Sequence, residues 1–267
     1  MAGAIVLAGG GKMGGAMLAG WLESGVAPAD VYVIEPQPEA ARRLAGLGIN
    51  VSAAPDNLPA AAETVIFAVK PQIMNDVVPH YHGLAGGGTV FLSIAAGCKI
   101  SLFEEHLGQV PVVRAMPNTP AAIGLGMTVA CANGATGEDQ KARCQSLLEA
   151  IGEVDWVADE ALMDPVTAVS GSGPAYVFLL IEALAAAGEE TGLAPALAMR
   201  LARATVRGAG ALASRADEGP DQLRINVTSP GGTTAAALEV LMAEDGLLPL
   251  MKRAVLAASA RSKELAG

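Results

Sequence analysis

Three glycines near the start of the chain have a spacing that suits the binding of a pyrophosphate. Gly9, Gly11 and Gly14 form the pattern Gly-x-Gly-x-x-Gly between a short apolar run and a segment that favours a helix. The first glycine permits a tight turn, the second lets the backbone approach a pyrophosphate, and the third lets helix and strand pack closely. Unpaired N–H groups and the helix dipole attract the phosphate charge there. The pattern predicts a dinucleotide site that includes Lys12 and Met13; the alternative is a glycine-rich turn without a ligand.

Two further segments follow apolar runs and are expected at the same edge of a sheet. Glu35 ends the second run, where a carboxylate accepts hydrogen bonds from the adenosine ribose and repels a 2′-phosphate. No arginine follows it directly, which favours NADH; the alternative is a solvated acid at a strand end. The sequence Ala68-Val69-Lys70-Pro71 ends the strongest apolar run. There Lys70 either meets a phosphate or lies at the rim without one.

A second cluster of glycines and hydroxyls precedes a helical run late in the chain. It consists of Ser229, Gly231, Gly232, Thr233 and Thr234 in the sequence Ser-Pro-Gly-Gly-Thr-Thr. A helix start leaves backbone N–H groups without intrahelical partners, and these groups can hold a small carboxylate. Simple capping of the helix by the hydroxyls is the alternative explanation.

The elements that would position these groups alternate between strand and helix in the first part of the chain. Fully apolar strands separated by helices indicate a mainly parallel sheet covered on both faces, as in a Rossmann domain. We place this α/β domain at residues 1–159. The expected strands are 4–7, 31–34, 64–69, 89–94, 111–115, 127–132 and 155–157, and the expected helices are 12–24, 38–47 and 138–150.

The pattern changes after about residue 159, and no convincing strand follows. We place an all-α domain at residues 160–267, with helices over 174–190, 195–215, 233–243 and 249–264. The first of these is apolar nearly all round, which predicts a buried helix. No stretch is expected to be long and apolar enough to span a bilayer, because the best candidate, Tyr176 to Ala187, is short and carries Glu182.

The composition narrows the classes of function. Hydrophobic residues make up 52% and charged residues only 16%, so the chain is expected to fold, and its formal net charge of −10 opposes binding to nucleic acid. Cys98, Cys131 and Cys144 lack the spacing of a disulfide framework or a metal site. Together with an N-terminal apolar run that does not have the form of a signal peptide, they predict a cytoplasmic protein with reduced thiols and no metal.

Five motifs occur in an order that resembles pyrroline-5-carboxylate reductases. They are Gly9 to Gly14, Ala68 to Gln72, Met116-Pro-Asn-Thr-Pro120, Ser170-Gly-Ser-Gly-Pro-Ala-Tyr176 and Ser229-Pro-Gly-Gly-Thr-Thr234. The resemblance covers essentially the whole chain, and the last motif is its most diagnostic part. It implies reduction of 1-pyrroline-5-carboxylate to L-proline with NADPH or NADH. It also implies a helical dimerisation domain, and a homodimer that can assemble further.

The resemblance also implies roles for individual residues. The nicotinamide is expected near Met116, Pro117 and Asn118, the adenosine near Asn57, and Ala96 is expected to contact the cofactor as well. The substrate is expected at Ser229 to Thr234. Thr234 is the candidate catalytic residue, whose hydroxyl would hydrogen-bond the imine nitrogen and either donate a proton or orient the ring. Members of the family often prefer NADPH, which conflicts with the preference that Glu35 predicts.

Three other functions compete with this interpretation. A β-hydroxyacid dehydrogenase would have a catalytic lysine in the helix after a glycine-rich segment, and no lysine occurs from Ser170 to Glu190. A reductase of another cyclic imine fits the same motifs. A protein that senses dinucleotides without catalysis would retain the first glycine cluster but would not need Ser229 to Thr234.

Overall fold

The computed structural model describes residues 3–265, and its contacts divide the chain into two compact units. Unit 1 comprises the residues up to Gly171 together with those from Ser259 onward, and unit 2 comprises Ser172–Ala258. The last residues of the chain therefore belong to the first unit. The domain boundary expected at residue 159 stays a prediction, since the compact units describe contacts within this chain alone.

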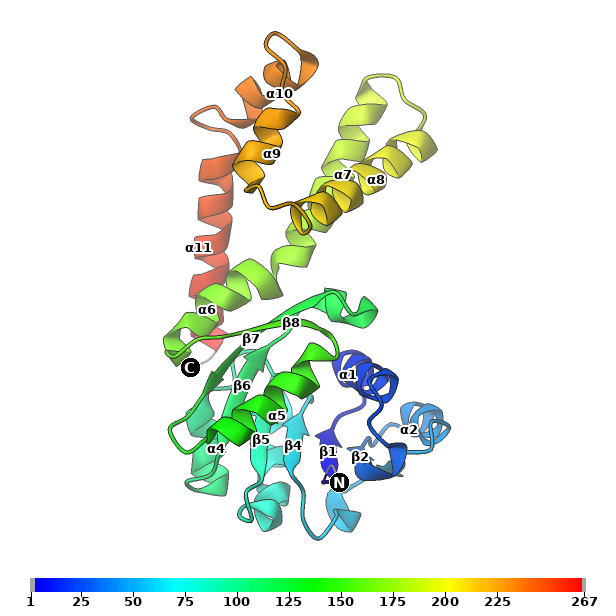
Figure 1. Ribbon diagram of the computed structural model, residues 1–267, viewed down its shortest axis with the longest axis vertical. Helices are drawn as coiled ribbons and strands as arrows, with labels where there is room; N and C mark the ends of the chain where they lie inside the picture. Colours follow the sequence, from blue (N-terminus) through cyan, green and yellow to red (C-terminus); the bar gives the residue numbers. More distant parts are fainter. Residues whose placement is uncertain (1–2, 266–267) are drawn as a thin grey trace. The chain divides into compact units, whose positions relative to one another are not determined.

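Unit 1 is built on one eight-stranded sheet with the strand order β3-β2-β1-β4-β5-β6-β7-β8 (Figure 1). All neighbouring strands are parallel except β6 and β7, which are antiparallel. This arrangement confirms the mainly parallel α/β sheet expected from the sequence. The strands are β1 (Ile5–Ala8), β2 (Val31–Ile34), β3 (Asn50–Ser52), β4 (Thr64–Phe67), β5 (Val90–Ser93), β6 (Val112–Met116), β7 (Gly126–Ala132) and β8 (Gly152–Trp156).

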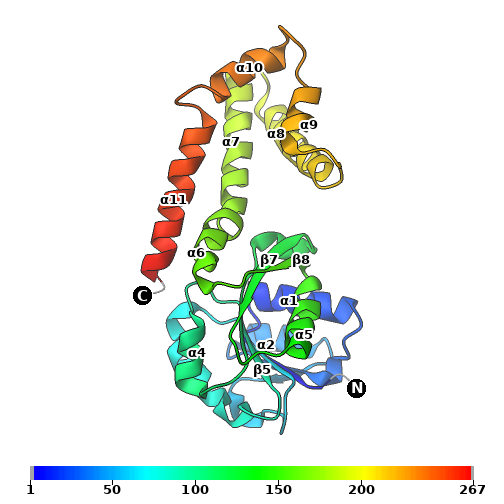
Figure 2. The ribbon, with the colours of Figure 1, turned by 60° about the vertical axis from the view of Figure 1, so that its left-hand side comes forward.

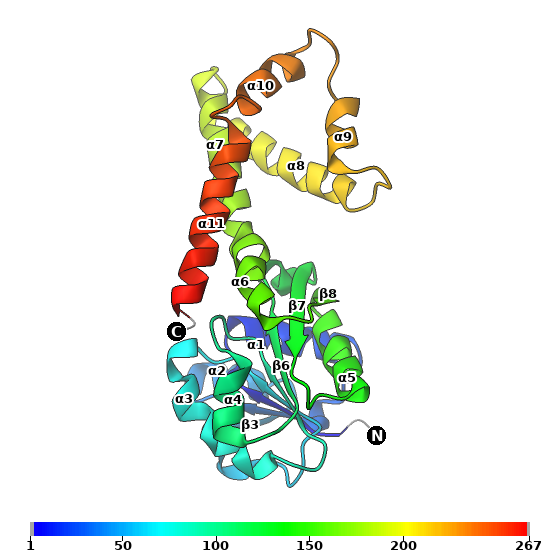
Figure 3. The same ribbon diagram turned by 90° about the vertical axis from the view of Figure 1, so that its left-hand side faces the viewer.

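Helices cover both faces of this sheet because its central strands are apolar on both sides (Figures 2 and 3). One core lies between the sheet and α1, α2 and α5, and includes Trp21 and Leu148. The other lies beneath α3, the 3₁₀ helix η4 (Val78–Leu84), α4 and α6, and includes Tyr81 and Phe103. The helices of unit 1 are α1 (Lys12–Glu23), α2 (Pro38–Ala45), α3 (Met74–Val77), α4 (Ile100–Leu107), α5 (Glu138–Glu149) and α6 (Met163–Val166).

Short 3₁₀ helices and one π-helical turn connect these elements. A π-helical turn, η7 (Thr167–Gly171), lies between α6 and the first helix of unit 2. The 3₁₀ helices are η1 (Pro28–Asp30), η2 (Pro55–Asn57), η3 (Pro71–Ile73), η4 (Val78–Leu84), η5 (Thr119–Ile123) and η6 (Glu160–Leu162).

Unit 2 is helical, as the sequence predicts. Its helices are α7 (Gly173–Glu190), α8 (Pro195–Ala213), α9 (Pro220–Asn226), α10 (Thr233–Leu241) and α11 (Leu247–Leu265), and the last one continues into unit 1. Helices α7 and α8 pack side by side around Ala185, Ala198 and Ala202. The end of α11 is fastened within unit 1, where the Ser262 hydroxyl donates a hydrogen bond of 2.6 Å to the carboxylate of Asp164 on α6.

The prediction of a buried helix at 174–190 is wrong for this chain alone. Along α7 only Ala185 is buried, and the side chain of Leu179 is 64% exposed. The helical run Glu160–Glu190 is also long and apolar enough to cross a membrane by length and composition, contrary to the sequence expectation. Its apolar residues are exposed because the chain itself provides too few partners to cover them.

Candidate functional site

Most of the predicted cofactor residues of unit 1 follow five strands of the sheet. The registers Ala8↔Ile34, Ala8↔Phe67 and Phe67↔Ser93 place the carboxyl ends of β1, β2, β4 and β5 at one edge, and β6 continues it. Gly9, Glu35, Ala68, Ala96 and Met116 therefore lie at or just beyond this edge. The order of β3 to β6 is that of a Rossmann fold, in which a dinucleotide crosses the point where the strand order reverses.

The glycine-rich turn has the geometry that its spacing predicts. Gly9 has a φ of +98°, a conformation that favours glycine, and its N–H donates to the Ile34 carbonyl at 2.9 Å. A Cβ at Gly14 would lie 2.1 Å from the Gly9 carbonyl oxygen, so the helix and the turn touch at this position. By contrast, no described atom apart from its chain neighbours lies within 4 Å of a Cβ built on Gly11. The turn thus leaves room for a pyrophosphate at the start of α1.

Glu35 is 6% exposed, and its carboxylate lies against the same turn. One carboxylate oxygen accepts the Gly10 N–H at 2.9 Å, and the other accepts the Gln37 N–H at 2.9 Å. The Glu35 carboxylate therefore links the glycine-rich turn to Gln37, in the connection between β2 and α2. Each oxygen retains a further lone pair, so hydrogen bonds to a ribose remain compatible with this geometry.

The remaining cofactor candidates are less enclosed. Asn57, at the end of η2, lines a cavity of about 310 Å³ beside β2 and β3, whose other lining residues include Ile34 and Ser52. Lys12, Lys70 and Ala96 are exposed at the strand edge. These side chains can approach a ligand from solvent, because no described hydrogen bond or ion pair holds them in place.

Asn118 lies in the segment that leaves β6, and its side chain is bonded to the protein. Its Nδ2 group donates to the carbonyl and to the hydroxyl of Ser170, both at 3.3 Å, while its Oδ1 accepts the Met127 N–H at 3.0 Å. Pro117 is buried and Met116 is half-buried. This segment therefore offers mainly its backbone to a ligand at the strand edge.

The predicted substrate residues lie in unit 2, apart in the chain from the cofactor candidates. Gly231 has a φ of +70°, and the Gly232 N–H donates to the Ser229 carbonyl at 3.0 Å. Gly232 begins α10 without a side-chain cap, so the capping explanation for Thr233 and Thr234 has no support in the described hydrogen bonds. Thr234 is half-buried on the first turn of the helix. The amides of this turn can hold a small carboxylate.

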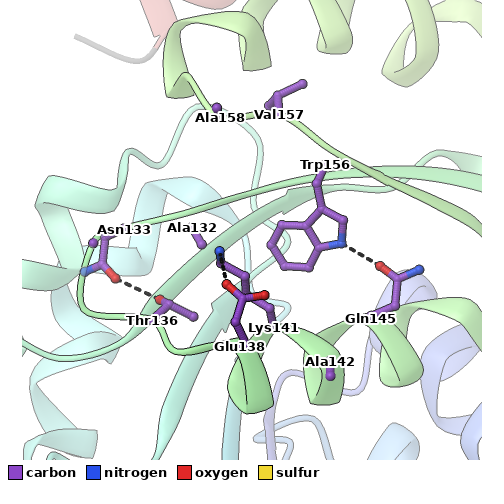
Figure 4. A pocket seen from close by; sticks show the side chains of 11 residues that line it. Ala132, Asn133, Thr136, Glu138, Lys141, Ala142, Gln145, Trp156, Val157 and Ala158 are labelled. Atoms are coloured by element: carbon purple, nitrogen blue, oxygen red, sulfur yellow. Dashed lines mark hydrogen bonds and ion pairs between the residues drawn. The ribbon is translucent and has the colours of Figure 1, made fainter.

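A groove of about 900 Å³ lies between α5 and the edge strand β8 (Figure 4). Its polar side chains bond to one another: Trp156 to Gln145 at 2.5 Å, Lys141 to Glu138 at 2.8 Å, and Thr136 to Asn133 at 2.8 Å. None of the predicted site residues lines it.

The titratable groups with shifted pKa values lie inside unit 1. Burial raises the pKa of the Cys144 thiol to about 12, and burial also raises the pKa values of Cys98 and Cys131. These thiols are neutral at physiological pH and unsuited to nucleophilic chemistry. Among residues 3–265, no group of three or more His, Cys, Asp or Glu could hold a metal ion.

Sequence reasoning missed the partners that organise the site. Gly10 supplies the N–H that binds Glu35, and Ser170 receives the Asn118 side chain. Gly10 lies inside the glycine motif, but the motif assigns no role to that position. Pro174 could have indicated the role of Ser170. A proline has no N–H, so the carbonyl four residues before it lacks its usual helical donor.

Two family models match the chain. The first, described as pyrroline-5-carboxylate reductase dimerisation, matches residues 160–265. The second, described as NADP oxidoreductase coenzyme F420-dependent, matches residues 4–97. The matched residues cover most of the helical region and the first five strands of the sheet.

Similar proteins of known identity span the whole chain. A pyrroline-5-carboxylate reductase from Synechocystis sp. is 43% identical over 262 residues, covering 96% of this chain and 96% of its own. A solved pyrroline-5-carboxylate reductase from Coxiella burnetii superposes with a TM-score of 0.95 at 34% identity, covering 100% of both chains. A Plasmodium falciparum pyrroline carboxylate reductase with NADP bound has a TM-score of 0.83 at 28% identity, covering 99% of this chain and 98% of its own.

Proposed function

Because this chain belongs to the pyrroline-5-carboxylate reductase family, we propose that it reduces 1-pyrroline-5-carboxylate to L-proline with NADPH or NADH. This reaction is the last step of proline biosynthesis. The observation that carries the proposal is full-length similarity to such enzymes, combined with an intact glycine-rich turn in unit 1 and an uncapped helix start in unit 2.

The cofactor is proposed to bind at the carboxyl edge of the sheet in unit 1. The open space beside Gly11 and the start of α1 suit the pyrophosphate, which the N–H groups of the turn would hold. Glu35 and Asn57 are proposed to contact the adenosine part, and Met116 to Asn118 the nicotinamide part. The full proposed set is Gly9, Gly11, Lys12, Met13, Gly14, Glu35, Asn57, Ala68, Val69, Lys70, Pro71, Ala96, Met116, Pro117 and Asn118.

The substrate is proposed to bind at the start of α10. Its carboxylate would accept hydrogen bonds from the amides of Thr233 and Thr234 on the first turn of the helix, with Ser229 and Gly231 shaping the turn before it. We propose that the hydroxyl of Thr234 bonds the imine nitrogen and orients the ring or supplies its proton.

The chemistry requires little from the protein beyond positioning. When bound, the reduced nicotinamide supplies the hydride that adds to the carbon of the C=N bond. The residues of the chain would bind and orient each reactant, and an imine that binds already protonated needs no strong acid. Holding two reactants in a reactive geometry can supply much of the rate by itself.

The apolar helices of unit 2 are proposed to pack against a second copy of the chain. Phe178 and Leu179 on α7 are 57% and 64% exposed, and the family model that matches this region describes dimerisation. A homodimer would cover these side chains, so we infer that the apolar run Glu160–Glu190 faces protein and not a membrane. We further propose that dimers assemble into larger particles and that the enzyme works in the cytoplasm.

The direct test follows the oxidation of NADPH and of NADH by the nicotinamide absorbance, with 1-pyrroline-5-carboxylate as substrate and proline as the analysed product. Rapid turnover with stoichiometric proline is the expected result. Turnover of a different cyclic imine would replace the substrate while retaining the reaction. Cofactor binding without turnover of any imine would instead indicate a sensor.

A further inference from the structure

We propose that Asn118 is a positioning residue, which fastens the exit of β6 to the π-helical turn η7 and so fixes the backbone that faces the nicotinamide. The inference rests on the proposed function, because it assigns a role in hydride transfer. It differs from a binding role for the Asn118 side chain, since that side chain would act through the segment Met116–Asn118 and not on the ligand.

The hydrogen bonds of Asn118 occupy all its polar atoms. Nδ2 donates to the carbonyl and the hydroxyl of Ser170, and Oδ1 accepts the N–H of Met127 at the start of β7. One side chain thus connects three segments of unit 1: the exit of β6, the start of β7 and the turn η7. A side chain with its donors and acceptor used in this way has little left to offer a cofactor.

The sequence explains why the Ser170 carbonyl needs a donor from a side chain. In an α-helix its partner would be the N–H of the residue four positions later, and that residue is Pro174, which has no N–H. The next amide, that of Ala175, instead donates to the Ser172 carbonyl at 3.0 Å. Asn118 therefore supplies, from a distant segment, the hydrogen bond that proline withholds. The π-helical turn itself is a feature that often marks functional positions.

A packing contact holds the same two segments together. A Cβ built on Gly171 would lie 2.6 Å from the terminal methyl of Met116, so this methionine lies directly against the turn. Met116 and Asn118 therefore contact consecutive residues of η7. Between them stands the buried Pro117, which limits the freedom of the backbone. The segment 116–118 is thus held by contacts at its first and last residues and is stiffened by the proline between them.

The consequence is that the position of the nicotinamide-facing backbone depends on the side chain of Asn118. Without it, this backbone loses its links to Ser170 and Met127 and keeps the strand pairing of Met116 with Val129 and the bond from the Ala121 N–H to the Asn118 carbonyl. Small errors in the distance between hydride donor and acceptor reduce the rate of transfer strongly, and a shift of about 1 Å can cost about a hundredfold.

The test compares wild type with Asn118→Ala in the full-length protein. We expect kcat to fall by about tenfold to a hundredfold. The dissociation constant of the cofactor, measured by nicotinamide fluorescence, should change by less than about threefold, since the glycine-rich turn is intact. With cofactor deuterated at the transferred position, the kinetic isotope effect on kcat should rise, because hydride transfer becomes rate-limiting.

A second variant separates positioning from stability. Pro174→Ala restores an N–H where the Ser170 carbonyl can accept it, so the double variant Asn118→Ala/Pro174→Ala no longer leaves this carbonyl unpaired. We expect the double variant to regain thermal stability relative to Asn118→Ala but to keep the reduced kcat and the raised isotope effect. Pro174→Ala alone should keep Asn118 bonded to Met127 and retain a kcat near that of wild type.

Three results would overturn the inference. They are an Asn118→Ala protein that is folded and has the kcat and isotope effect of wild type, a double variant whose kcat recovers together with its stability, and a cofactor affinity that falls as much as kcat does. Absence of turnover by the wild-type protein would instead refute the proposed function. The two failures are distinguishable because the first is a comparison between active proteins.

Discussion

At the scale of single residues, Glu35 combines a structural role that is observed with a selective role that is predicted. The sequence predicts an acid at the end of a strand that selects against a 2′-phosphate, and that role stays a prediction. What the structure adds is the pair of hydrogen bonds from the Gly10 and Gln37 amides, both at 2.9 Å. The same carboxylate that would meet the ribose also holds the turn that would meet the pyrophosphate. Its removal should therefore affect both parts of the cofactor.

Glu35→Ser should raise the use of NADPH relative to NADH, because a negative charge beside the ribose is lost. It should also weaken binding of both cofactors, since loss of an acceptor from a buried N–H costs about 1–3 kcal/mol. Steady-state kinetics with each cofactor measures the ratio, and fluorescence titration measures the two affinities. The matched control is Glu39→Ser on the exposed side of α2. An unchanged ratio would show that Glu35 does not select the cofactor.

Thr234→Ala should lower kcat by about a hundredfold if the hydroxyl orients or protonates the imine. The affinity for the cofactor should remain near that of wild type, because the proposed cofactor residues all belong to unit 1. The control is Thr191→Ala, which removes an exposed hydroxyl whose bond is to the Gly188 carbonyl. Thr234 leaves the mechanism if turnover by the variant equals that of wild type.

At the scale of elements, the glycine-rich turn was predictable because a tight turn and a close approach of the backbone both require glycine. The direction of β7 was not predicted, since an apolar run has the same pattern in parallel and antiparallel strands. The short connection through η5 is what makes β7 run back along β6, as parallel strands need a long crossover. The strand β3 was also missed, because its three residues have half-buried or exposed side chains and lack an apolar pattern.

Two adjacent glycines of α1 allow a matched test of the packing argument. Gly14→Ala would place a methyl group 2.1 Å from the Gly9 carbonyl, whereas Gly15→Ala would place one 3.7 Å from the nearest atom. We expect Gly14→Ala to lower the free energy of unfolding by about 3 kcal/mol and to abolish cofactor binding. Gly15→Ala should be neutral or stabilising by up to about 1 kcal/mol, as alanine favours a helix.

Urea unfolding of both variants, followed by circular dichroism, measures the difference. Equal stabilities for the two variants would mean that the turn relaxes around the added methyl group and that close contact does not explain the glycine at position 14.

At the scale of the whole molecule, the helical unit was predicted in type but not in burial. A helix apolar on all sides was expected to lie in a core, yet α7 exposes Val177, Phe178, Leu179 and Leu180 within its own chain. Hydrophobic periodicity reports that a surface is covered and does not say which chain covers it. The burial of α7 could not be predicted because one sequence does not show which other chain covers its apolar side chains.

Leu179→Glu should break the proposed dimer, because a carboxylate buried without a partner in an apolar interface is strongly unfavourable. Size-exclusion chromatography with light scattering should show a smaller particle, and activity should fall with it. Leu47→Glu in unit 1, where the leucine is 47% exposed, provides the control and should leave the particle size unchanged. A Leu179→Glu protein with the wild-type mass would place the interface elsewhere.

Alkaline pH should destabilise the folded chain through its buried thiols. The unfolded chain releases the Cys144 proton near pH 9, whereas the folded chain holds it until about pH 12. The contribution to stability is thus fully present below pH 9 and is lost as the pH rises toward 12. Tyr81, whose pKa burial also raises, acts in the same direction.

Urea unfolding at a series of pH values measures this loss, and Cys144→Ala should show a shallower decline above pH 9 than wild type. An identical decline in the two proteins would assign the alkaline sensitivity to other groups.

The hydrogen bond between Ser262 and Asp164 has a consequence for biosynthesis. Residues from Ser259 onward complete the first compact unit, yet the ribosome makes them only after the whole of Ser172–Ala258. The nascent Rossmann sheet can form early, but its α6 stays without this partner until α11 emerges. By then the helices proposed to pair with a second chain are already outside the exit tunnel. Pairing of two chains can therefore begin before either nucleotide-binding unit is finished.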